Sequence, residues 1–381
     1  MVELIGFLLL IIPLAFDGLY ACVVSMLSKR KNLPIGDAKA RPYLSIIIPT
    51  YNEIKIIQRR VENLDQLNYP KDRIEVIFVD GASKDGTPDL IERLALDGRP
   101  FLRVIRQPTR QGYNAAIYEG ICESKADIIV TGESGSFFHP EGVNIVIQHL
   151  ADPTVGVATG GSELYNPDEN LTTKLEASYR QAHDKLRFAE SKLDSTPDMK
   201  GELLAFRKEI GLKLKPRKTL PDSAAFDMSL SYMTRRSGYR AIYDPNAIFY
   251  EYAPTSLKDR FIVQVRRGTA FTGAFWNFKD MAFRRKFGYF GMLVVPSRLF
   301  SLILFPWMLL LAPVVLVAEL FIDPLVPALM LALIGAALIP KKSRYLLISF
   351  LLSQVMLAAA TLRLLFRRHT QIINTVPTAR R

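Results

Sequence analysis

Cysteine and histidine are scarce in this chain of 381 residues, which has two cysteines and four histidines. Cys22 lies in an apolar run near the N-terminus and Cys122 lies in a predicted helix, so the pair gives no disulfide framework. The histidines are scattered and show none of the short spacings of a structural zinc site. The sequence therefore predicts neither a disulfide-stabilised fold nor a structural metal.

Acidic residues are also fewer than basic ones, 37 against 49, which gives a formal net charge of +12. In a soluble chain this excess would suggest a nucleic-acid partner, but no module of interleaved aromatic and basic residues is present. The bases cluster beside long apolar runs, where anionic lipid headgroups would attract them. We therefore expect membrane lipids, and no nucleic acid, as partners.

The first apolar run, Leu4 to Leu27, is long enough to cross a bilayer and carries one charge, Asp17. It lacks a basic leader and a small-residue cleavage site, so residues 1–28 are predicted to form an anchor rather than a removed signal peptide. The basic residues 29–31 follow at once, and the positive-inside rule places that end in the cytoplasm. We expect a multi-pass plasma-membrane protein whose large charged domain is cytoplasmic.

Residues 291–368 form a second hydrophobic block, with predicted spans at about 298–320, 324–339 and 345–366. Basic loops at 284–286 and 341–344 should both be cytoplasmic, which two crossings between them satisfy. A third full crossing would place the basic tail, 369–381, outside the cell, against the same rule. Two to three C-terminal membrane helices are therefore predicted, and a re-entrant last segment is one alternative.

Between the hydrophobic blocks, residues 42–255 alternate between strand and helix patterns. Strands are predicted at 43–48, 74–79, 102–106 and 126–131, and helices at 54–67, 87–96 and 112–124. Short loops in this repeat require right-handed crossovers and a parallel sheet. A charged helix is predicted at 171–193, followed by a strand over 200–207.

Two strings in this region each join an apolar run to a polar, turn-forming loop: residues 45–53 (SIIIPTYNE) and 79–87 (VDGASKDGT). In an open parallel sheet such loops lie at the carboxyl ends of strands, where ligands bind. Pro49 ends the first ladder because it has no N–H, so Thr50 to Glu53 should line the crevice. Asp80, at the tip of the second strand, is suited to accept hydrogen bonds from a base or ribose.

In this order and spacing, the two strings resemble the nucleotide-binding half of a family 2 glycosyltransferase with the GT-A fold, a Rossmann-like α/β domain with a mostly parallel sheet. The resemblance covers roughly residues 43–278. It implies a nucleotide-sugar donor, a divalent ion and inversion at the anomeric carbon. The donor-binding residues that it implies are Pro49, Thr50, Tyr51, Glu53, Asp80, Gly112, Gln264 and Arg267.

The family places an Asp-x-Asp motif after the fourth strand, seven residues before a proline. Counting back from Pro140 gives Glu133-Ser134-Gly135, so the first carboxylate is Glu and the second is replaced by Gly. A single carboxylate can hold Mg²⁺ or Mn²⁺ together with waters and the diphosphate. Glu133 is therefore the predicted metal ligand. Weak or absent metal binding, and a plain turn with an exposed Glu, stay as alternatives.

The acceptor side of the family carries a catalytic Asp about eleven residues before a Gly-Tyr pair. Asp227 fits this count before Gly238, and Asp222 is the second candidate. Phe226 stands where many relatives have an acidic residue. A carboxylate here would take the proton of an attacking hydroxyl, whereas a phosphate acceptor would need that base less. Asp227 would alternatively serve as the N-cap of a helix over 228–236.

Residues 264–267 (QVRR) resemble the Gln-x-x-Arg-Trp motif of processive polysaccharide synthases and its variant in nonprocessive relatives. The resemblance implies that Arg267 clamps the diphosphate, for which a forked guanidinium is suited. Gly268 replaces the Trp, which weakens the synthase interpretation. Predicted acceptor contacts are Gly201, Glu202 and Trp276. Residues 256–290 are predicted to form an interfacial amphipathic segment, and the alternative for Arg267 is that it simply belongs to this membrane-surface stretch.

These features together predict an inverting glycosyltransferase that moves a sugar from a nucleotide-diphosphate sugar to a glycan or polyprenyl acceptor anchored in the membrane. A processive polysaccharide synthase, exporting its polymer through the C-terminal spans, is the alternative enzyme. A noncatalytic nucleotide-sugar-binding membrane protein is the alternative class and is favoured only by Gly135. A transporter is disfavoured because the predicted spans contain few polar residues.

Overall fold

The computed structural model describes residues 5–37, 39–319 and 339–366, and between the last two ranges residues 321, 324, 325, 328, 329, 332 and 335. The predicted span 324–339 therefore falls largely outside the described residues. The basic tail 369–381 falls entirely outside them.

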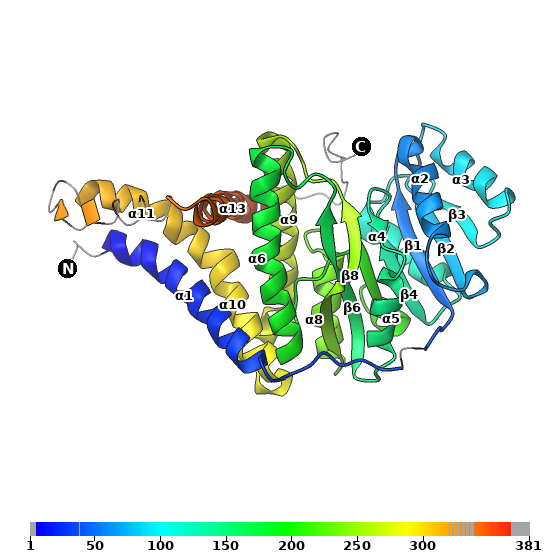
Figure 1. Ribbon diagram of the computed structural model, residues 1–381, viewed down its shortest axis with the longest axis horizontal. Coiled ribbons are helices and arrows are strands. Elements are labelled where there is room, and N and C mark those ends of the chain that lie inside the picture. Colours follow the sequence, from blue (N-terminus) through cyan, green and yellow to red (C-terminus); the bar gives the residue numbers. More distant parts are fainter. Residues whose placement is uncertain are drawn as a thin grey trace.

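An eight-stranded mixed sheet forms the core of the charged domain (Figure 1), in the order β3-β2-β1-β4-β7-β6-β8-β5. Strands β3, β2, β1 and β4 are parallel, whereas β7 is antiparallel to both of its neighbours, β4 and β6. The strands are β1 (Leu44–Thr50), β2 (Ile74–Asp80), β3 (Leu102–Arg106), β4 (Ile128–Gly132), β5 (Phe137–Phe138), β6 (Val155–Leu164), β7 (Leu203–Arg207) and β8 (Arg240–Glu251).

Helices cover both faces of this sheet, as its doubly apolar strands require. Residues Ile46, Ile47 and Ile48 are all fully buried, and they alternate between two hydrophobic cores on opposite faces. One core packs against α2 (Ile54–Asp65), α3 (Thr87–Leu96) and α5 (Gly142–Leu150). The other packs against α4 (Tyr113–Glu123), α8 (Phe226–Arg236) and α9 (Leu257–Phe278).

The predicted β-α repeat is confirmed. Every strand and helix predicted between residues 43 and 131 is present, and the ends differ by two residues at most. The predicted charged helix 171–193 is α6, with the same bounds. The predicted strand 200–207 is the shorter β7, because residues 200–202 form the turn that enters it.

Three described helices are long and apolar enough to cross a membrane: α1 (Ile5–Ser28), the continuous helix Phe290–Glu319, and Arg344–Leu365 within α13 (Lys341–Leu365). The second comprises α10 (Val295–Leu299), α11 (Phe305–Glu319) and two π-helical turns, Phe290–Val294 and Phe300–Leu304. Pro296 and Pro306 remove the N–H groups that would bond the carbonyls four residues earlier. Each of those carbonyls lies in a π turn, a usual way to accommodate such a break.

Helix α6 stands between the sheet and the apolar helices (Figure 1). Near its C-terminal end, the buried Glu190 accepts hydrogen bonds from Tyr20 of α1 at 2.5 Å and from Arg298 of α10 at 2.8 Å. Near its N-terminal end, the Leu175 carbonyl accepts a hydrogen bond from Ser349 of α13 at 2.9 Å. The sheet domain and the apolar helices are therefore joined through buried polar contacts at both ends of one helix.

Candidate active site

The two polar strings of the sequence meet at the carboxyl ends of β1 and β2. Thr50 and Asp80 are register partners there, and the Thr50 hydroxyl donates to the Asp80 carboxylate at 3.3 Å. The loops are also bonded to each other, since the backbone N–H of Asn52 donates to the Ser83 hydroxyl at 2.8 Å and that of Lys84 to the Asn52 side chain at 2.9 Å. The strings form one structural unit, as expected of a crevice between neighbouring strands.

A first cavity opens over this unit and is lined by most of the predicted donor-binding residues: Pro49, Thr50, Tyr51, Glu53, Gly112, Gln264 and Arg267. Asp80 is not part of the lining. It is 1% exposed, and its carboxylate accepts hydrogen bonds from the hydroxyl and N–H of Ser83 at 2.6 and 2.8 Å. In this structure Asp80 therefore shapes the loop beneath the cavity, and a direct contact with a nucleotide stays a prediction.

The loop between β3 and α4 supplies residues of this cavity that the sequence motifs missed. The Arg110 guanidinium lies over the Tyr51 ring, 3.6 Å from its centroid, and both line the cavity. Gly112, with φ of +94°, precedes the first residue of α4 in a backbone conformation that favours glycine. The position of this loop, at the carboxyl end of β3, was the only sequence signal that could have indicated Arg110.

Glu133 follows β4 directly, and the pairing of β4 with β7 gives it an acidic neighbour. Gly132, the last residue of β4, is the register partner of Leu203, the first residue of β7. Because these strands are antiparallel, Glu133 after β4 and Glu202 before β7 lie at the same edge of the sheet. Burial and the charge of Glu202 raise the pKa of Glu133 to about 8. Glu133 is not simply an exposed turn residue, because it lines both cavities of the site.

This acidic pair bears on the predicted metal ion. Among the described residues, no group of three or more His, Cys, Asp or Glu side chains could hold a metal ion alone. Two carboxylates whose mutual repulsion raises a pKa would nevertheless be stabilised by a cation. The donor set fits an ion that takes its remaining ligands from a bound diphosphate and water. Glu202, rather than position 135, would then supply the second acidic side chain.

Asp227 and Gly201 line a second cavity, beside the first. Asp227 is in the first turn of α8, but the N-cap is Ala225, so the helix-capping alternative for Asp227 is wrong. Burial and the Glu202 charge raise the pKa of Asp227 to about 7, although a 2.8 Å hydrogen bond from the Met228 N–H opposes the shift. A carboxyl group with this pKa is suited to accept a proton at neutral pH.

Gly201 lies in the narrow gap between Asp227 and Tyr113. A Cβ atom added to Gly201 would be 3.1 Å from the Tyr113 hydroxyl and 3.9 Å from an Asp227 carboxylate oxygen. The second candidate base, Asp222, is at the rim of the second cavity, with 41% of its side chain exposed and an ion pair to Arg217 at 3.1 Å. Of the two aspartates, Asp227 alone has the burial expected of a tuned base.

Arg267 of α9 stands where the two cavities meet. Its guanidinium donates to Glu202 at 3.1 Å, and nearby Gln264 donates to Glu176 at 3.1 Å. The wall between the cavities is mainly charged. The residues that line both cavities are Tyr113, Glu133, Glu176, Arg180, Glu251, Gln264, Arg266 and Arg267.

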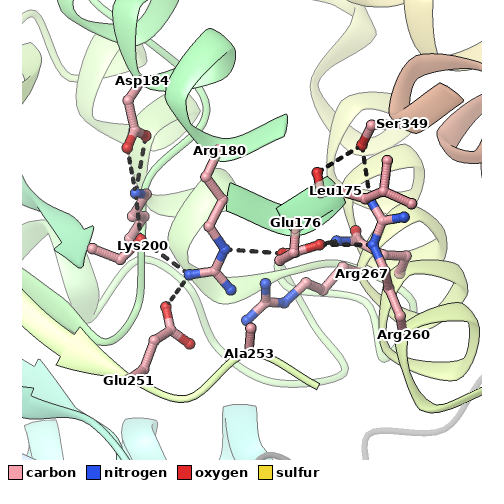
Figure 2. A network of polar contacts seen from close by, with 12 residues as sticks. Leu175, Glu176, Arg180, Asp184, Lys200, Glu251, Ala253, Arg260, Arg267 and Ser349 are labelled. Carbon is pink, nitrogen blue, oxygen red and sulfur yellow. Dashed lines mark hydrogen bonds and ion pairs between the residues drawn. The ribbon is translucent and has the colours of Figure 1, made fainter. Parts of the chain in front are cut away.

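A polar network on α6 holds this wall in place (Figure 2). Glu176 accepts from Arg180 at 2.9 Å and from Arg260 of α9 at 3.0 Å, and Arg180 also pairs with Glu251 of β8. Arg260 reaches the membrane-type helix α13 by donating to Ser349 at 2.9 Å. The sequence motifs missed these residues, but the spacing of four between Glu176 and Arg180 in a charged helix was a usable signal.

Lys200 extends the network on the other side of Arg180 (Figure 2) and lines the second cavity. Its ammonium group lies 2.9 Å from an Asp184 carboxylate oxygen and 3.0 Å from the Ser162 hydroxyl. Burial lowers the pKa of Lys200 to about 8, and the nearby arginines act in the same direction. The segment 200–202 thus places a cation, a small residue and an acid at successive positions of the cavity.

Trp276 is not brought to the site. It is 54% exposed, it belongs to neither cavity lining, and the Lys279 ammonium group lies 3.7 Å from its ring centroid. The aromatic residue of α9 that lines the second cavity is Phe271. Trp276 is nine residues beyond Arg267, or two and a half helical turns, so it points from the opposite side of α9. Pattern reasoning identified the correct helix but the wrong face.

Known proteins resemble both the sequence and the fold. Residues 45–212 match the family model of glycosyl transferase family 2. The solved structure of mannosyltransferase PcManGT from Pyrobaculum calidifontis, in complex with GDP-Man and Mn²⁺, superposes with a TM-score of 0.82 at 26% sequence identity, covering 97% of this chain and 100% of that one. Residues 45–212 therefore form a glycosyl transferase family 2 domain, and the chain has a GT-A-like fold with long apolar helices at both ends.

Curated relatives match over shorter regions. The probable glycosyltransferase YdaM of Bacillus subtilis is 27% identical over 230 residues, 58% of this chain and 53% of that protein. The beta-monoglucosyldiacylglycerol synthase of Synechocystis is 29% identical over 143 residues, 36% of this chain and 30% of that protein. The chain thus spans about half or less of the length of these relatives.

Proposed function

We propose that this protein is an inverting glycosyltransferase that moves a sugar from a nucleotide-diphosphate sugar to a lipid-linked acceptor at the membrane surface. The observation that carries the proposal is the junction of the two cavities. The first lies over the β1 and β2 loops and the second contains Asp227, with Arg267 and Glu133 lining both. A donor in the first cavity would present its anomeric carbon toward a base in the second. The PcManGT complex supports a nucleotide-sugar donor.

The chemistry proposed for this junction is a single displacement. The acceptor hydroxyl loses its proton to Asp227 as its oxygen bonds to the anomeric carbon, and the bond to the diphosphate breaks with the electron pair leaving on the phosphate oxygen. Arg267 then stabilises the charge that grows on the diphosphate. Tyr113, in the first turn of α4, lies beside Gly201 and would limit the positions open to the acceptor.

A divalent cation, Mg²⁺ or Mn²⁺, would supply further charge neutralisation on the diphosphate. Glu133 would hold it, with Glu202 as an acidic neighbour, and the raised pKa of Glu133 supports a cation at this edge. Mn²⁺ in the PcManGT complex supports the same choice. Because the described residues offer no group of three or more ligands, we expect the ion to bind together with the nucleotide rather than before it.

The lipid-linked acceptor is supported by the surroundings of the second cavity. Its lining includes Arg266, Ala270 and Phe271 of α9 and Arg363 of α13, so an apolar helix of membrane type borders the cavity that holds Asp227. An acceptor anchored in the bilayer could reach Asp227 from this side without leaving the membrane. The name of the Synechocystis relative, a diacylglycerol-modifying enzyme, is consistent with a lipid acceptor.

Processive synthesis is less well supported. At Gly268, where synthases carry Trp, an added Cβ would lie 3.0 Å from Ala360 and 3.1 Å from Leu357 of α13. The close approach of two helices therefore occupies the space that an aromatic side chain would need. Single addition of a sugar is the simpler proposal for this chain.

We further propose that the sheet domain is cytoplasmic and that α13 lies along the membrane surface instead of crossing it. Ser349 bonds to Arg260, and the Ala360 carbonyl accepts from Thr269 at 3.4 Å, so both touch α9. Ala360 is eleven positions after Ser349, a helical length of about 16 Å, and the eight residues of α13 before Ser349 add about 12 Å. Neither length crosses a hydrocarbon core of about 30 Å.

This arrangement supports one topology for the basic segments. The chain would leave the cytoplasm along Phe290–Glu319 and would be back on the cytoplasmic side where α13 begins. Residues 341–344 and the last described residue, Phe366, would then both be cytoplasmic, as the positive-inside rule favours. In Figure 1, α13 is seen nearly along its axis while α1 extends across the view, which is consistent with different directions for the two helices.

The function is tested by incubating the purified protein in nanodiscs with a panel of nucleotide sugars, Mn²⁺ and membrane lipids. We expect nucleoside-diphosphate release that depends on the lipid fraction, and a lipid-extractable product extended by one sugar. Release of nucleotide without any lipid product would contradict the acceptor. A ladder of long polymer would instead support the synthase.

A further inference from the structure

Two arginines from different helices lie in the wall of the second cavity. Arg266 is in the middle of α9, and Arg363 is in the last turn of α13. Both line this cavity, and Arg266 also lines the first. The cavity that contains Asp227 thus has a cationic side that the proposed transfer reaction does not use.

The packing of α9 against α13 brings these arginines together. The helices approach closely at Gly268, which has no side chain to separate them from Ala360 and Leu357. Val265, Met356 and Ala360 form a small buried cluster at the same contact. Arg266 is next to Val265, and Arg363 is three residues after Ala360. The contact between Val265 and Ala360 therefore holds the backbone of each arginine near the cavity.

The electrostatics of Arg266 differ from those of its neighbours on α9. Arg260 and Arg267 pair with Glu176 and Glu202, whereas Arg266 has no ion-pair partner among the residues that the structure describes. Burial lowers the pKa of Arg266. The charges of Arg267 and Arg363 act in the same direction, whereas those of Glu133 and Glu202 oppose the shift. Like charges held together in a partly buried place are stabilised when an anion binds between them.

We propose that Arg266 and Arg363 bind the phosphate that links the acceptor sugar to its membrane lipid. The inference rests on the proposed function and specifies its substrate as a lipid phosphate rather than a neutral glycolipid. Guanidinium groups are suited to this role because each can offer two donors to phosphate oxygens.

A lipid headgroup, rather than a free phosphate, is favoured by the residues around Arg363. Leu362 and Leu365, in an apolar helix of membrane type, are 41% and 74% exposed, and Phe366, directly after that helix, is 70% exposed. They form an apolar surface at the same end of α13 as Arg363. A lipid phosphate could place its charge between the arginines and its hydrocarbon chain against this surface, which inorganic phosphate cannot do.

The proposal is tested by direct binding, without transfer. Full-length protein in phosphatidylcholine nanodiscs is titrated with a fluorescent polyprenyl phosphate and with the matching polyprenol. We expect wild type to prefer the phosphate, and Arg266→Gln and Arg363→Gln each to weaken its binding by about 10–100-fold, the range for a lost charged hydrogen bond. Arg363→Lys should restore part of the affinity because it restores the charge.

Arg285→Gln is the matched control, because Arg285 is an exposed base near the membrane helices but lines neither cavity. It should bind like wild type, and melting temperatures should show that all variants are folded. Equal binding of phosphate and alcohol by wild type, or normal binding by Arg363→Gln, would overturn the proposal. Full competition by equimolar inorganic phosphate would overturn the lipid headgroup as the ligand.

Nucleoside-diphosphate affinity, measured by calorimetry on the same samples, separates this inference from the proposed function. Arg363→Gln should leave that affinity unchanged, because Arg363 lines only the second cavity. If wild type binds lipid phosphate but no nucleotide, the transferase proposal fails while the phosphate site stands. If it binds nucleotide and transfers sugar to a neutral lipid, the phosphate site fails alone.

Discussion

Arg267 of α9 and Glu202 before β7 form an ion pair of 3.1 Å at the junction of two cavities. The same Glu202 raises the pKa values of Glu133 and Asp227, each of which is also affected by Arg267 in the opposite direction. One ion pair thus adjusts the charge of both the proposed metal ligand and the proposed base. Its partner groups come from segments 65 residues apart in the sequence.

Arg267→Lys tests the guanidinium of this pair. Lysine keeps the charge but cannot form two parallel hydrogen bonds to a diphosphate, so both donor affinity and turnover should fall. We expect a loss of about 10–100-fold in kcat/KM, equivalent to one or two charged hydrogen bonds. Arg236→Lys, at an exposed ion pair with Asp280, is the control and should be neutral. Unchanged kinetics for Arg267→Lys would exclude Arg267 from the diphosphate clamp.

Asp227→Asn tests the base. The variant keeps the side-chain shape but accepts no proton, so kcat should fall by about 10²–10⁴ while nucleotide affinity hardly changes. The wild-type rate should rise with pH through about 7, because Asp227 must be ionised to act, and the residual rate of the variant should lack this step. Asp222→Asn is the matched control and should remain active. If Asp222→Asn lost activity while Asp227→Asn kept it, Asp222 would be identified as the base.

Glu133→Gln tests the acidic edge through stability as well as activity. The pKa of Glu133 is about 8 in the folded protein and 4.5 in its ordinary state. Between pH 4.5 and 8 the folded protein therefore keeps a proton on Glu133 that the unfolded chain has lost. The unfolding free energy of the ligand-free protein should therefore fall as pH rises from about 4.5 to 8. At pH 8 the variant should be more stable than wild type, because its neutral amide does not have to lose a proton in this buried place.

The same variant reports on the ion. Mn²⁺ added with a nucleoside diphosphate should raise the melting temperature of wild type more than the nucleotide alone does, and this increment should disappear in Glu133→Gln. Glu163→Gln, at an exposed position of β6, should behave like wild type in both measurements. An undiminished Mn²⁺ increment in Glu133→Gln would assign the ion to other ligands.

Glu176→Gln tests the network on α6. Burial alone would raise the pKa of Glu176, but the charges of Arg180 and Arg260 hold it at about 2. The stabilisation is therefore complete above pH 4.5 and is lost as pH falls toward 2. The variant removes the carboxylate partner of the buried Arg260 and one of the two carboxylate partners of Arg180, which should cost about 3–5 kcal/mol near neutral pH. A melting temperature equal to that of Asp168→Asn, an exposed control, would contradict this account.

Cysteine labelling tests the direction of α13. In a background without Cys22 and Cys122, single cysteines at Phe366 and Phe321 are exposed to an impermeant maleimide in sealed inside-out vesicles. Phe366→Cys should react and Phe321→Cys should not, because α13 would stay on the cytoplasmic face while Phe321 follows the outward helix. Protection of both positions until the vesicles are opened would show that α13 crosses the membrane.

Local sequence patterns were sufficient to predict the core of the sheet domain. Runs such as Ile46–Ile48 are apolar on both faces and β-branched, so they favour buried parallel strands whatever surrounds them. Pro49, Gly81 and Gly86 mark where these strands and loops turn, which is why the crevice at Thr50 and Asp80 was predictable. The resemblance to glycosyl transferase family 2 rested on these same segments and is confirmed.

The side chains that join the two cavities depend on contacts between distant segments. Glu202 meets Glu133 because β7 enters the sheet antiparallel to β4, a choice that an apolar strand pattern does not encode. Trp276 and Arg267 both lie on α9, and the packing of α9 on α8 and α13 decides which of them faces the site.

The sequence by itself determined the α/β sheet domain, the apolar helices and the loops at the strand ends, because these follow from local hydrophobic periodicity and turn residues. Only the tertiary structure decided that Asp80 is buried under its loop, that Asp227 and Glu133 share the influence of Glu202, and that α13 reaches the cavity with Arg363. Burial and the distance between charges arise when separate elements pack, and these two quantities set the ionisation and accessibility of each group.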